Sequence, residues 1–249
     1  MSRKIAVISD IHGNILALEK ITADIKSRQI DLVYNLGDHL SGPLWPKETA
    51  DFLKQQDWLH LLGNHDRNLI SHKLDDLGPS DYYAGQRITS DDLEWLKTLP
   101  ADAETNEGIY LCHGGPRNDL LYLLETIENK RVRLAAPHEI KERLADTDAP
   151  LLLCGHTHIP RIVQLDTGQL IVNPGSAGLP AYDDQKPEYH IIENGSPHAR
   201  YAVLEKNGSS WDVEIIAVSY DHQTAAKKAS ENGRPDWEIG LNSGFMTSG

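Results

Sequence analysis

Cysteines, basic residues and long apolar runs are scarce in this sequence of 249 residues, and each scarcity excludes a class of protein. The two cysteines, Cys112 and Cys154, are too few for a disulfide framework, so a reducing cytoplasm is the expected location. No stretch approaches the roughly 18 consecutive apolar residues of a membrane-spanning helix, because runs such as Leu151–Cys154 have only the length of a strand. The first apolar run, residues 5–8, is too short for the core of a signal peptide.

Basic residues are in deficit, since 24 Lys and Arg stand against 37 Asp and Glu, which gives a net charge of −13. Long nucleic acids are bound through a basic surface that neutralises their phosphates, so we expect no such partner, and no membrane either. The remaining composition, 39% hydrophobic and 24% charged, is that of an ordinary globular protein able to bury a substantial core. Twelve histidines, by contrast, are many for this length, and their positions carry the first functional information.

Short apolar runs alternate with helical patterns up to Gly155, which is typical of βαβ units. The expected strands are residues 5–8, 32–36, 58–62, 109–112 and 151–154, and the expected helices are residues 14–26, 46–55 and 90–99. A mostly helical stretch is expected between about Leu120 and Leu144. After Gly155, turns rich in Gly, Asn and Pro separate short strands, which predicts an antiparallel sheet of residues 161–165, 170–172, 200–204 and 211–216. A final helix is expected from Asp221 to about Ser230.

The sequence therefore predicts an α/β protein in which two sheets pack together with helices outside. One domain is expected over residues 1–231, with residues 116–148 as a helical cap on the site. Residues 232–249 are rich in glycine and serine, so we expect a loosely ordered tail there.

Polar side chains follow five of the apolar runs, at the point where each run ends. The segments are Ser9-Asp10-Ile11-His12, Gly37-Asp38-His39, Gly63-Asn64-His65-Asp66, His113-Gly114-Gly115 and Gly155-His156-Thr157-His158. Because the C-terminal ends of parallel strands meet at one edge of a sheet, where ligands bind, we expect these side chains to lie together. Each segment alone is a weak signal, since Gly, Asn and Asp are also common in turns. The set of five is what argues for a functional site.

Imidazole, carboxylate and amide groups without cysteine suit divalent ions such as Mn, Fe, Co, Ni or Zn. The candidate ligands are Asp10, His12, Asp38, Asn64, His113, His156 and His158. They outnumber the four ligands of a tetrahedral zinc ion, which favours two ions with one carboxylate between them. The charge of two divalent ions exceeds that of two carboxylates and a bridging hydroxide, so the site attracts phosphate, and the ions lower the pKa of bound water to supply a nucleophile.

The five segments, in this order, resemble the motifs of the calcineurin-like metallophosphoesterases, which are Asp-x-His, Gly-Asp, Gly-Asn-His-Asp/Glu, His and Gly-His-x-His. The runs Asn173-Pro174-Gly175-Ser176 and His113-Gly114-Gly115-Pro116-Arg117 resemble those of the small bacterial branch. The resemblance covers most of residues 4–205 and implies a two-sheet β sandwich flanked by helices. It implies two metal ions, with manganese as the first candidate. One ion would be bound by Asp10, His12, Asp38 and His158, and the other by Asp38, Asn64, His113 and His156.

The resemblance also gives His65 the role of assisting the leaving group, and Asp66 that of orienting His65. Two further residues are candidates for substrate contacts. Arg117 has a planar guanidinium that can hold a phosphate oxygen, and His39 directly follows a candidate ligand. Each has a plain alternative: a surface salt bridge for Arg117, and an exposed loop position for His39.

The leading hypothesis is a hydrolase of small phosphate esters, nucleotide-type phosphodiesters above all, acting by in-line attack of a metal-bridging hydroxide. A phosphomonoesterase or a dinucleoside polyphosphate hydrolase on the same site is the alternative. A phosphoprotein phosphatase is disfavoured, because the arginine that those enzymes use after the second motif is missing from residues 39–43. A non-catalytic scaffold on the same fold is disfavoured as well, since such relatives lack the histidine that is present here as His65. The sequence leaves the oligomeric state open.

Overall fold

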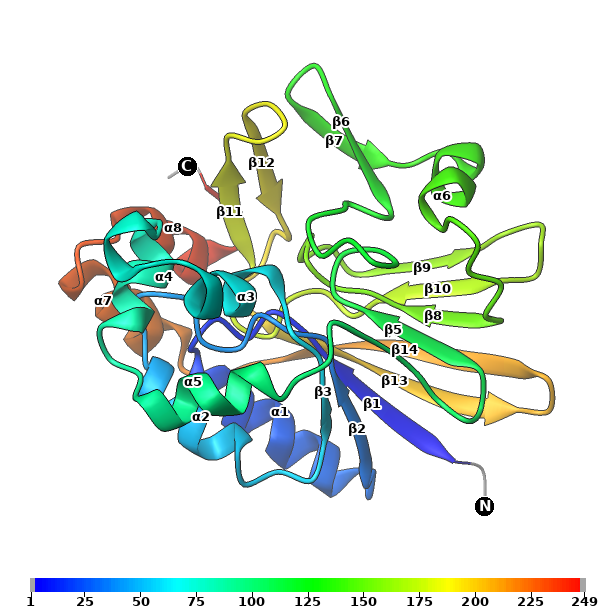
Figure 1. Ribbon diagram of the computed structural model, residues 1–249, viewed down its shortest axis with the longest axis horizontal. Coiled ribbons are helices and arrows are strands. Elements are labelled where there is room, and N and C mark those ends of the chain that lie inside the picture. Colours follow the sequence, from blue (N-terminus) through cyan, green and yellow to red (C-terminus); the bar gives the residue numbers. More distant parts are fainter. Residues whose placement is uncertain (1–2, 247–249) are drawn as a thin grey trace.

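The computed structural model describes residues 3–246, in which two five-stranded sheets pack face to face with helices outside (Figure 1). The predicted two-sheet α/β architecture is confirmed. The first sheet has the order β14 (Ser210–Val218), β13 (Ala199–Asn207), β1 (Lys4–Ile8), β2 (Leu32–Asn35) and β3 (Leu59–His60). The second has the order β4 (Asp102–Glu104), β5 (Ile109–Cys112), β8 (Leu151–Leu153), β10 (Leu170–Asn173) and β9 (Arg161–Gln164). Within residues 3–246, no helix is long and apolar enough to cross a membrane.

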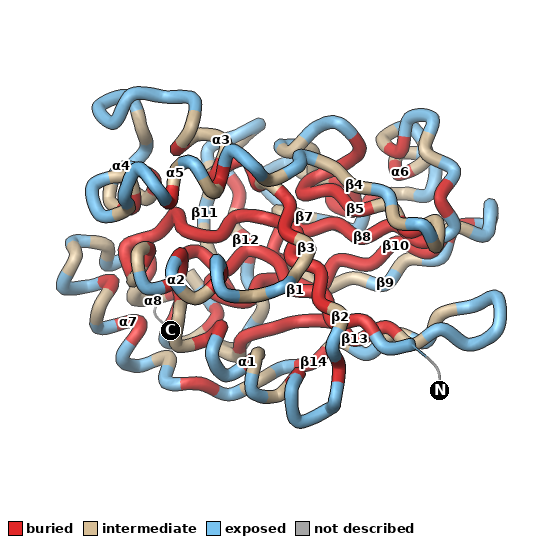
Figure 2. Tube along the Cα trace, turned by 60° about the horizontal axis from the view of Figure 1, so that its bottom comes forward, coloured by how far each residue is buried: buried red, intermediate tan, exposed pale blue. Residues whose placement is uncertain are grey.

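The central strands are buried on both faces, so they read as continuous apolar runs rather than alternating ones. Ile5 and Val7 of β1 point into the layer between the sheets, where they pack near Leu111 and Leu153 of the second sheet. Residues 6 and 8 point the other way, against helix α1 (Ile15–Ser27). Figure 2 shows buried segments running through both sheets and into the turns at their ends.

Helices cover the outer faces, four of them at positions that the sequence patterns predict; no helix was expected at residues 64–71 or 79–85. Helix α1 begins after Asn14, whose side chain accepts a hydrogen bond from the amide of Ala17 at 3.2 Å, as an N-cap does. The other helices on this side are α2 (Pro46–Leu53), α3 (Asn64–Ser71), α4 (Pro79–Gly85), α5 (Ser90–Lys97) and α7 (His222–Glu231), with a 3₁₀ turn at Leu74–Asp76.

The four strands predicted after Gly155 do not form a sheet of their own, which corrects the prediction of a separate antiparallel sheet. Strands β9 and β10 join the second sheet, and β10 pairs in parallel with β8. Strands β13 and β14 join the first sheet, where β13 pairs antiparallel with β1. The apolar pattern identifies these segments as strands, but their partners are chosen by packing between elements far apart in the sequence.

A helical cap was predicted for residues 116–148, but this segment is not mostly helical. It contains the hairpin of β6 (Glu125–Glu128) and β7 (Arg131–Leu134), followed by the short helix α6 (Pro137–Arg143). Asn129 and Lys130 both have positive φ, 54° and 61°, which reverses the chain tightly between the two strands. A second hairpin, β11 (Ala181–Asp184) and β12 (His190–Glu193), stands beside the first at the top of Figure 1, and β7 packs against β12.

The C-terminal segment also differs from the prediction of a loose tail. Helix α8 (Pro235–Ser243) packs on α7 and β11, with Trp237 and Leu241 buried. Proline in its first turn and Gly244 in the left-handed conformation after its end delimit the helix. The prediction of a loosely ordered tail over residues 232–249 is therefore wrong for the residues of α8. Residues 247–249 lie outside the described part of the chain.

Candidate active site

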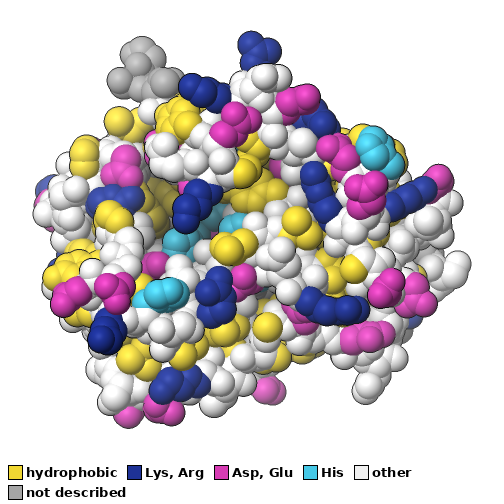
Figure 3. All heavy atoms as spheres, turned by 45° about the horizontal axis from the view of Figure 1, so that its top comes forward, with side chains coloured by type: hydrophobic (Ala, Val, Ile, Leu, Met, Phe, Trp, Pro, Cys, Tyr) yellow, Lys and Arg dark blue, Asp and Glu magenta, His cyan; other side chains and the backbone are white. Residues whose placement is uncertain are grey.

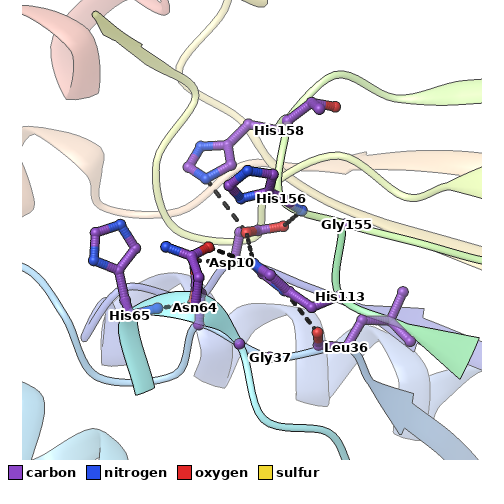
Figure 4. Close-up of polar contacts among 12 residues, drawn as sticks. Asp10, Leu36, Gly37, Asn64, His65, His113, Gly155, His156 and His158 are labelled. Atoms are coloured by element: carbon purple, nitrogen blue, oxygen red, sulfur yellow. Dashed lines mark hydrogen bonds and ion pairs between the residues drawn. The ribbon is translucent and has the colours of Figure 1, made fainter. Parts of the chain in front are cut away.

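The turns that leave β1, β2, β3, β5 and β8 converge on one region, where they bring all seven candidate ligands together. Figure 4 shows Asp10, Asn64, His113, His156 and His158 of this set. The first sheet supplies Asp10, His12, Asp38 and Asn64, and the second supplies His113, His156 and His158. Most of these side chains are buried. Two clusters of ligand atoms result, each with all its atoms within 4.8 Å of one another.

The first cluster consists of Asp10, His12 and His158. The Nε2 atom of His158 lies 3.4 Å from Oδ1 of Asp10 and 3.1 Å from Nε2 of His12. The other oxygen of Asp10 accepts a hydrogen bond from the amide of His156 at 3.1 Å. One carboxylate oxygen therefore holds the turn, while the other faces the imidazoles.

The second cluster consists of Asp38, His113 and His156. The Nε2 atom of His113 lies 3.2 Å from Oδ2 of Asp38 and 3.0 Å from the side-chain oxygen of Asn64. The two oxygens of Asp38 also have different partners, since Oδ1 accepts a hydrogen bond from the backbone amide of His65 at 2.9 Å. The two clusters adjoin, since Oδ2 of Asp38 is 3.9 Å from Nε2 of His12.

Backbone carbonyls fix the tautomers of three of these imidazoles. The Nδ1–H groups of His12, His113 and His158 donate to the carbonyls of Ser41, Leu36 and Leu179, each at 2.8 Å. When these rings are neutral, as metal binding requires, their Nε2 atoms present lone pairs to the centre of the site. Without a cation, burial lowers the pKa of His113, but Asp38 and Asp10 outweigh this and raise it to about 10. Histidines that bind metal ions are held in the same way, by a hydrogen bond from the second ring nitrogen.

This arrangement fits divalent cations and is unfavourable without them. In the neutral tautomers, the Nε2 lone pairs of His12 and His158 face each other at 3.1 Å without a proton to share. Among residues 3–246, no group hydrogen-bonds to the buried Oδ1 of Asp10. A buried carboxylate oxygen needs a partner, and a cation between it and the imidazoles satisfies both requirements.

Both carboxyl groups are ionised in this environment. Burial alone would raise the pKa of Asp10, but the imidazoles of His158 and His113 lower it to about 2. For Asp38, burial is likewise outweighed by His113 and His65, which hold the pKa of its carboxyl well below the usual range. The two acids thus offer negative charge to a cation.

Backbone conformation also distinguishes the site. Five of the seven candidate ligands have positive φ, between 52° and 67°: Asp10, His12, Asp38, His156 and His158. Non-glycine residues in sparsely populated conformations cost about 1–3 kcal/mol each and concentrate at functional sites. These backbone conformations therefore lower the stability of the fold, and they direct the five side chains toward the site.

Asp66 connects two of the turns, which corrects the prediction that it orients His65. Its carboxylate accepts hydrogen bonds from the amides of Gly63, Asp38 and His39 at 2.9–3.1 Å, and it pairs with Nδ1 of His39 at 2.6 Å. Asp66 is the third residue of α3, so its side chain reaches back to the start of the helix, as in a capping box. Glycine is required at position 63, because a Cβ atom there would overlap the carboxylate of Asp38.

The residue that orients His65 is Asp81, which lies in the first turn of α4. Its Oδ1 atom is 2.7 Å from Nδ1 of His65, and its Oδ2 accepts from the amide nitrogen of Asn68 at 3.1 Å. Asp81 is 4% exposed, whereas the His65 side chain is 34% exposed and lines the cleft. No sequence signal pointed to Asp81, since it belongs to none of the motifs.

Neither residue predicted to contact substrate is placed to do so. His39 is fully buried against Asp66, His60 and Trp95, so it cannot reach a ligand in the cleft. Arg117 is not one of the described residues that line the cleft. It sits in a tight turn with φ of 60°, and its amide donates to Asp102 of β4 at 2.8 Å, so the turn carries it away from the site.

A cleft of about 920 Å³ lies over the two clusters. Figure 3 shows histidine side chains at the bottom of a hollow, with hydrophobic side chains along its walls. It is also lined by residues that the sequence did not single out, among them Tyr122, Tyr182, Arg143, Arg234 and Trp237. They come from the cap segment, the hairpin of β11 and β12, and the C-terminal region around α8, which meet only in the folded chain.

Known proteins share this fold and much of this sequence's length. The chain is 26% identical over 248 residues to the uncharacterized protein MJ0912 of Methanocaldococcus jannaschii, covering 94% of both chains. A metallophosphoesterase from Sphaerobacter thermophilus shares the fold with a TM-score of 0.76 and 23% identity, over 98% of this chain and 100% of that one. The hypothetical protein PH1004 from Pyrococcus horikoshii OT3 gives a TM-score of 0.75 and 18% identity, over 97% and 98% of the two chains.

The family model of the calcineurin-like phosphoesterases matches residues 3–160, more than half of the chain, and this range contains both clusters. The protein is therefore a metal-dependent phosphoester hydrolase, and it belongs to the calcineurin-like phosphoesterase family.

Proposed function

We propose that the protein uses two divalent metal ions to hydrolyse small phosphate esters, nucleotide-type phosphodiesters among them, by in-line attack of hydroxide on phosphorus. The observation that carries this proposal is the pair of adjoining clusters at the bottom of one cleft. One ion would be held by Asp10, His12, Asp38 and His158, and the other by Asp38, Asn64, His113 and His156. Manganese is our first candidate, because the donors are imidazole, carboxylate and amide.

Divalent ions at these positions supply positive charge toward phosphate oxygens and favour the ionisation of water near neutral pH. The chain itself contributes fixed geometry. Asp10 and Asp38 each use one oxygen to hold a neighbouring turn and keep the other free for a cation. Because the imidazoles are locked by backbone carbonyls, little reorganisation is needed when ligands bind.

His65 is proposed to donate a proton to the leaving oxygen from Nε2. Its Nδ1–H is bound to Asp81, so the second ring nitrogen is the one available to substrate. Asp81 acts through His65 as a positioning residue, because it fixes the ring and stabilises the imidazolium. Phosphoproteins and long nucleic acids are disfavoured as substrates, since the two hairpins flank the cleft and the chain carries a net charge of −13.

Cys112 and Cys154 lie buried and unpaired at the ends of the neighbouring strands β5 and β8. Buried thiols of this kind act as small apolar side chains, and they support a reducing compartment such as the cytoplasm as the proposed location.

Metal stoichiometry tests the proposal directly. Chelator-treated protein is reloaded with Mn²⁺, and bound metal and turnover of bis(4-nitrophenyl) phosphate are measured together. We expect two equivalents in the active wild type, and loss of turnover and of one equivalent in Asp38→Asn. The matched control is Asp57→Asn, at an exposed position outside the cleft, which should retain both. Full activity with a single equivalent would refute the two-ion proposal.

A further inference from the structure

The cleft extends well beyond the two clusters, along a surface to which both hairpins contribute, and we call this part of the cleft the slot. The cap segment contributes Leu121, Tyr122 and Ile127 to the slot. The hairpin formed by β11 and β12, which packs against β7, contributes Tyr182 and Pro187. Leu120, at the edge of the slot, is 59% exposed. Clefts of about 300–1,000 Å³ with apolar walls and a few polar groups are typical of sites for organic ligands.

Aromatic rings begin directly beside the proposed metal ligands. The ring of Tyr122 lies edge-on to that of His156, with centroids 5.0 Å apart, and Tyr182 stands in the same relation to His158 at 4.7 Å. A group bonded to a phosphate held at the clusters would therefore meet these rings first.

The tyrosine hydroxyls are not available as donors to a ligand. Nδ1 of His190 donates to the carbonyl of Glu188, so its Nε2 accepts the hydrogen of Tyr122 at 3.1 Å. The oxygen of Tyr122 in turn accepts the hydrogen of Tyr182 at 2.8 Å. Because both protons are committed within this relay, the wall offers ring surface and acceptor lone pairs. Such a wall does not suit an anion, which requires donors.

The two guanidinium groups that line the cleft, those of Arg143 and Arg234, already bind other groups of the protein. Arg143 donates to the carbonyls of residues 122, 123 and 125, and to the hydroxyl of Thr126. Arg234 is paired with Asp236 and donates to the hydroxyl of Ser80 at 2.6 Å. The same lining carries four carboxylates (Glu125, Asp183, Asp184 and Asp236) against one further cation, Lys186, so this excess of negative charge does not favour a second phosphate group.

We propose that this slot binds an uncharged, planar aromatic substituent of an ester that carries a single phosphate group. The inference rests on the proposed function, because it places the phosphate at the two clusters. It also separates single-phosphate esters from dinucleoside polyphosphates, whose additional phosphates would meet carboxylates and committed donors.

Calorimetry with two phosphonates tests the slot in the Mn²⁺-loaded protein. Methylphosphonate and phenylphosphonate present the same anion, and only the second has a ring. We expect phenylphosphonate to bind at least tenfold more tightly, which corresponds to about 1.4 kcal/mol. A third probe, 4-carboxyphenylphosphonate, adds one negative charge at the far end of the ring and should bind at least threefold more weakly than phenylphosphonate.

Two variants test whether the preference for phenylphosphonate arises in the slot. Ile127→Asp should remove most of the preference for the phenyl compound and leave the affinity for methylphosphonate within twofold. Leu120→Asp should act in the same direction, and its exposed position keeps the fold intact. The matched control is Ile162→Asp, on β9 outside the cleft and 49% exposed, which should change neither affinity.

The outcomes distinguish this inference from the proposed function. Equal affinities for the two phosphonates in a protein that hydrolyses bis(4-nitrophenyl) phosphate would refute the slot alone. A protein that hydrolyses no ester with any of the candidate metals would refute the proposed function, and the slot with it.

Discussion

Replacing Asp81 by asparagine removes one charge from the pair that it forms with His65 and preserves the size of the side chain. In the wild type, both carboxylate oxygens accept, one from His65 at 2.7 Å and the other from Asn68 at 3.1 Å. An asparagine has one acceptor and one donor at these positions, so its NH₂ group must face either the Nδ1–H of His65 or the NH₂ of Asn68. The variant therefore loses a charge-assisted hydrogen bond and creates a buried donor–donor contact.

The magnitude follows from the hydrogen bond that is lost. Bonds to charged groups contribute about 1.5–3 kcal/mol, so we expect kcat to fall about 10- to 150-fold where proton donation by His65 limits the rate. An ester whose only leaving groups are poor, such as a dialkyl phosphodiester, should show the full loss. Release of nitrophenolate needs no proton and should be much less affected.

The assay compares kcat for the two kinds of leaving group, together with bound metal. Asp75→Asn, at an exposed position of the 3₁₀ turn, is the matched control and should behave like the wild type. If Asp81→Asn slowed both reactions by the same factor, or lost a metal ion, our assignment of Asp81 as the partner that orients His65 for proton donation would be wrong.

Three further predictions concern His65, Asp66 and the metal ions. His65→Ala should keep both ions and lower kcat by about 10²- to 10⁴-fold, with the larger loss for poor leaving groups; loss of metal in elemental analysis would contradict this. Asp66→Ala leaves the buried amides of Gly63, Asp38 and His39 without their acceptor, so urea denaturation should show a free energy of unfolding lower by more than about 3 kcal/mol. Free Mn²⁺ at a hundred times its Kd should stabilise the fold by about 2.7 kcal/mol, and a Tm unchanged by chelator would exclude metal binding to the folded chain.

Sequence reasoning succeeded where chemistry and strand periodicity coincide. Asp10, His12 and Asp38 could be grouped from the sequence because each follows a buried parallel strand, and topology alone then brings the strand ends together. Asp81 and Tyr122 could not be found in this way. Their contacts arise from the packing of α4 on α3 and of one hairpin on another, which no local spacing encodes.

Two errors have identifiable causes. The position of His39 next to Asp38 suggested a substrate contact, but its side chain lies in the core against Asp66, His60 and Trp95. The four glycines and two serines of residues 232–249 suggested a loose tail and so concealed helix α8. Pro235 and the spacing of Trp237 and Leu241 were the signals that predict a short helix with one buried face.

Because the candidate ligands are divided between the two sheets, the distance between the sheets determines the distances among the ligands. The first sheet contributes the carboxylates, the amide and the imidazole of His12, and the second contributes three imidazoles, so neither sheet alone holds a complete set. Side chains such as Leu111, Leu153 and Val7 fill the layer between the sheets, and none of the three is among the described residues that line the cleft. Under the two-ion proposal, we expect a loss of volume in this layer to shift one half of the ligands against the other and so to change metal affinity from a distance. Variation in that layer would then change which ion the protein prefers without altering a single ligand.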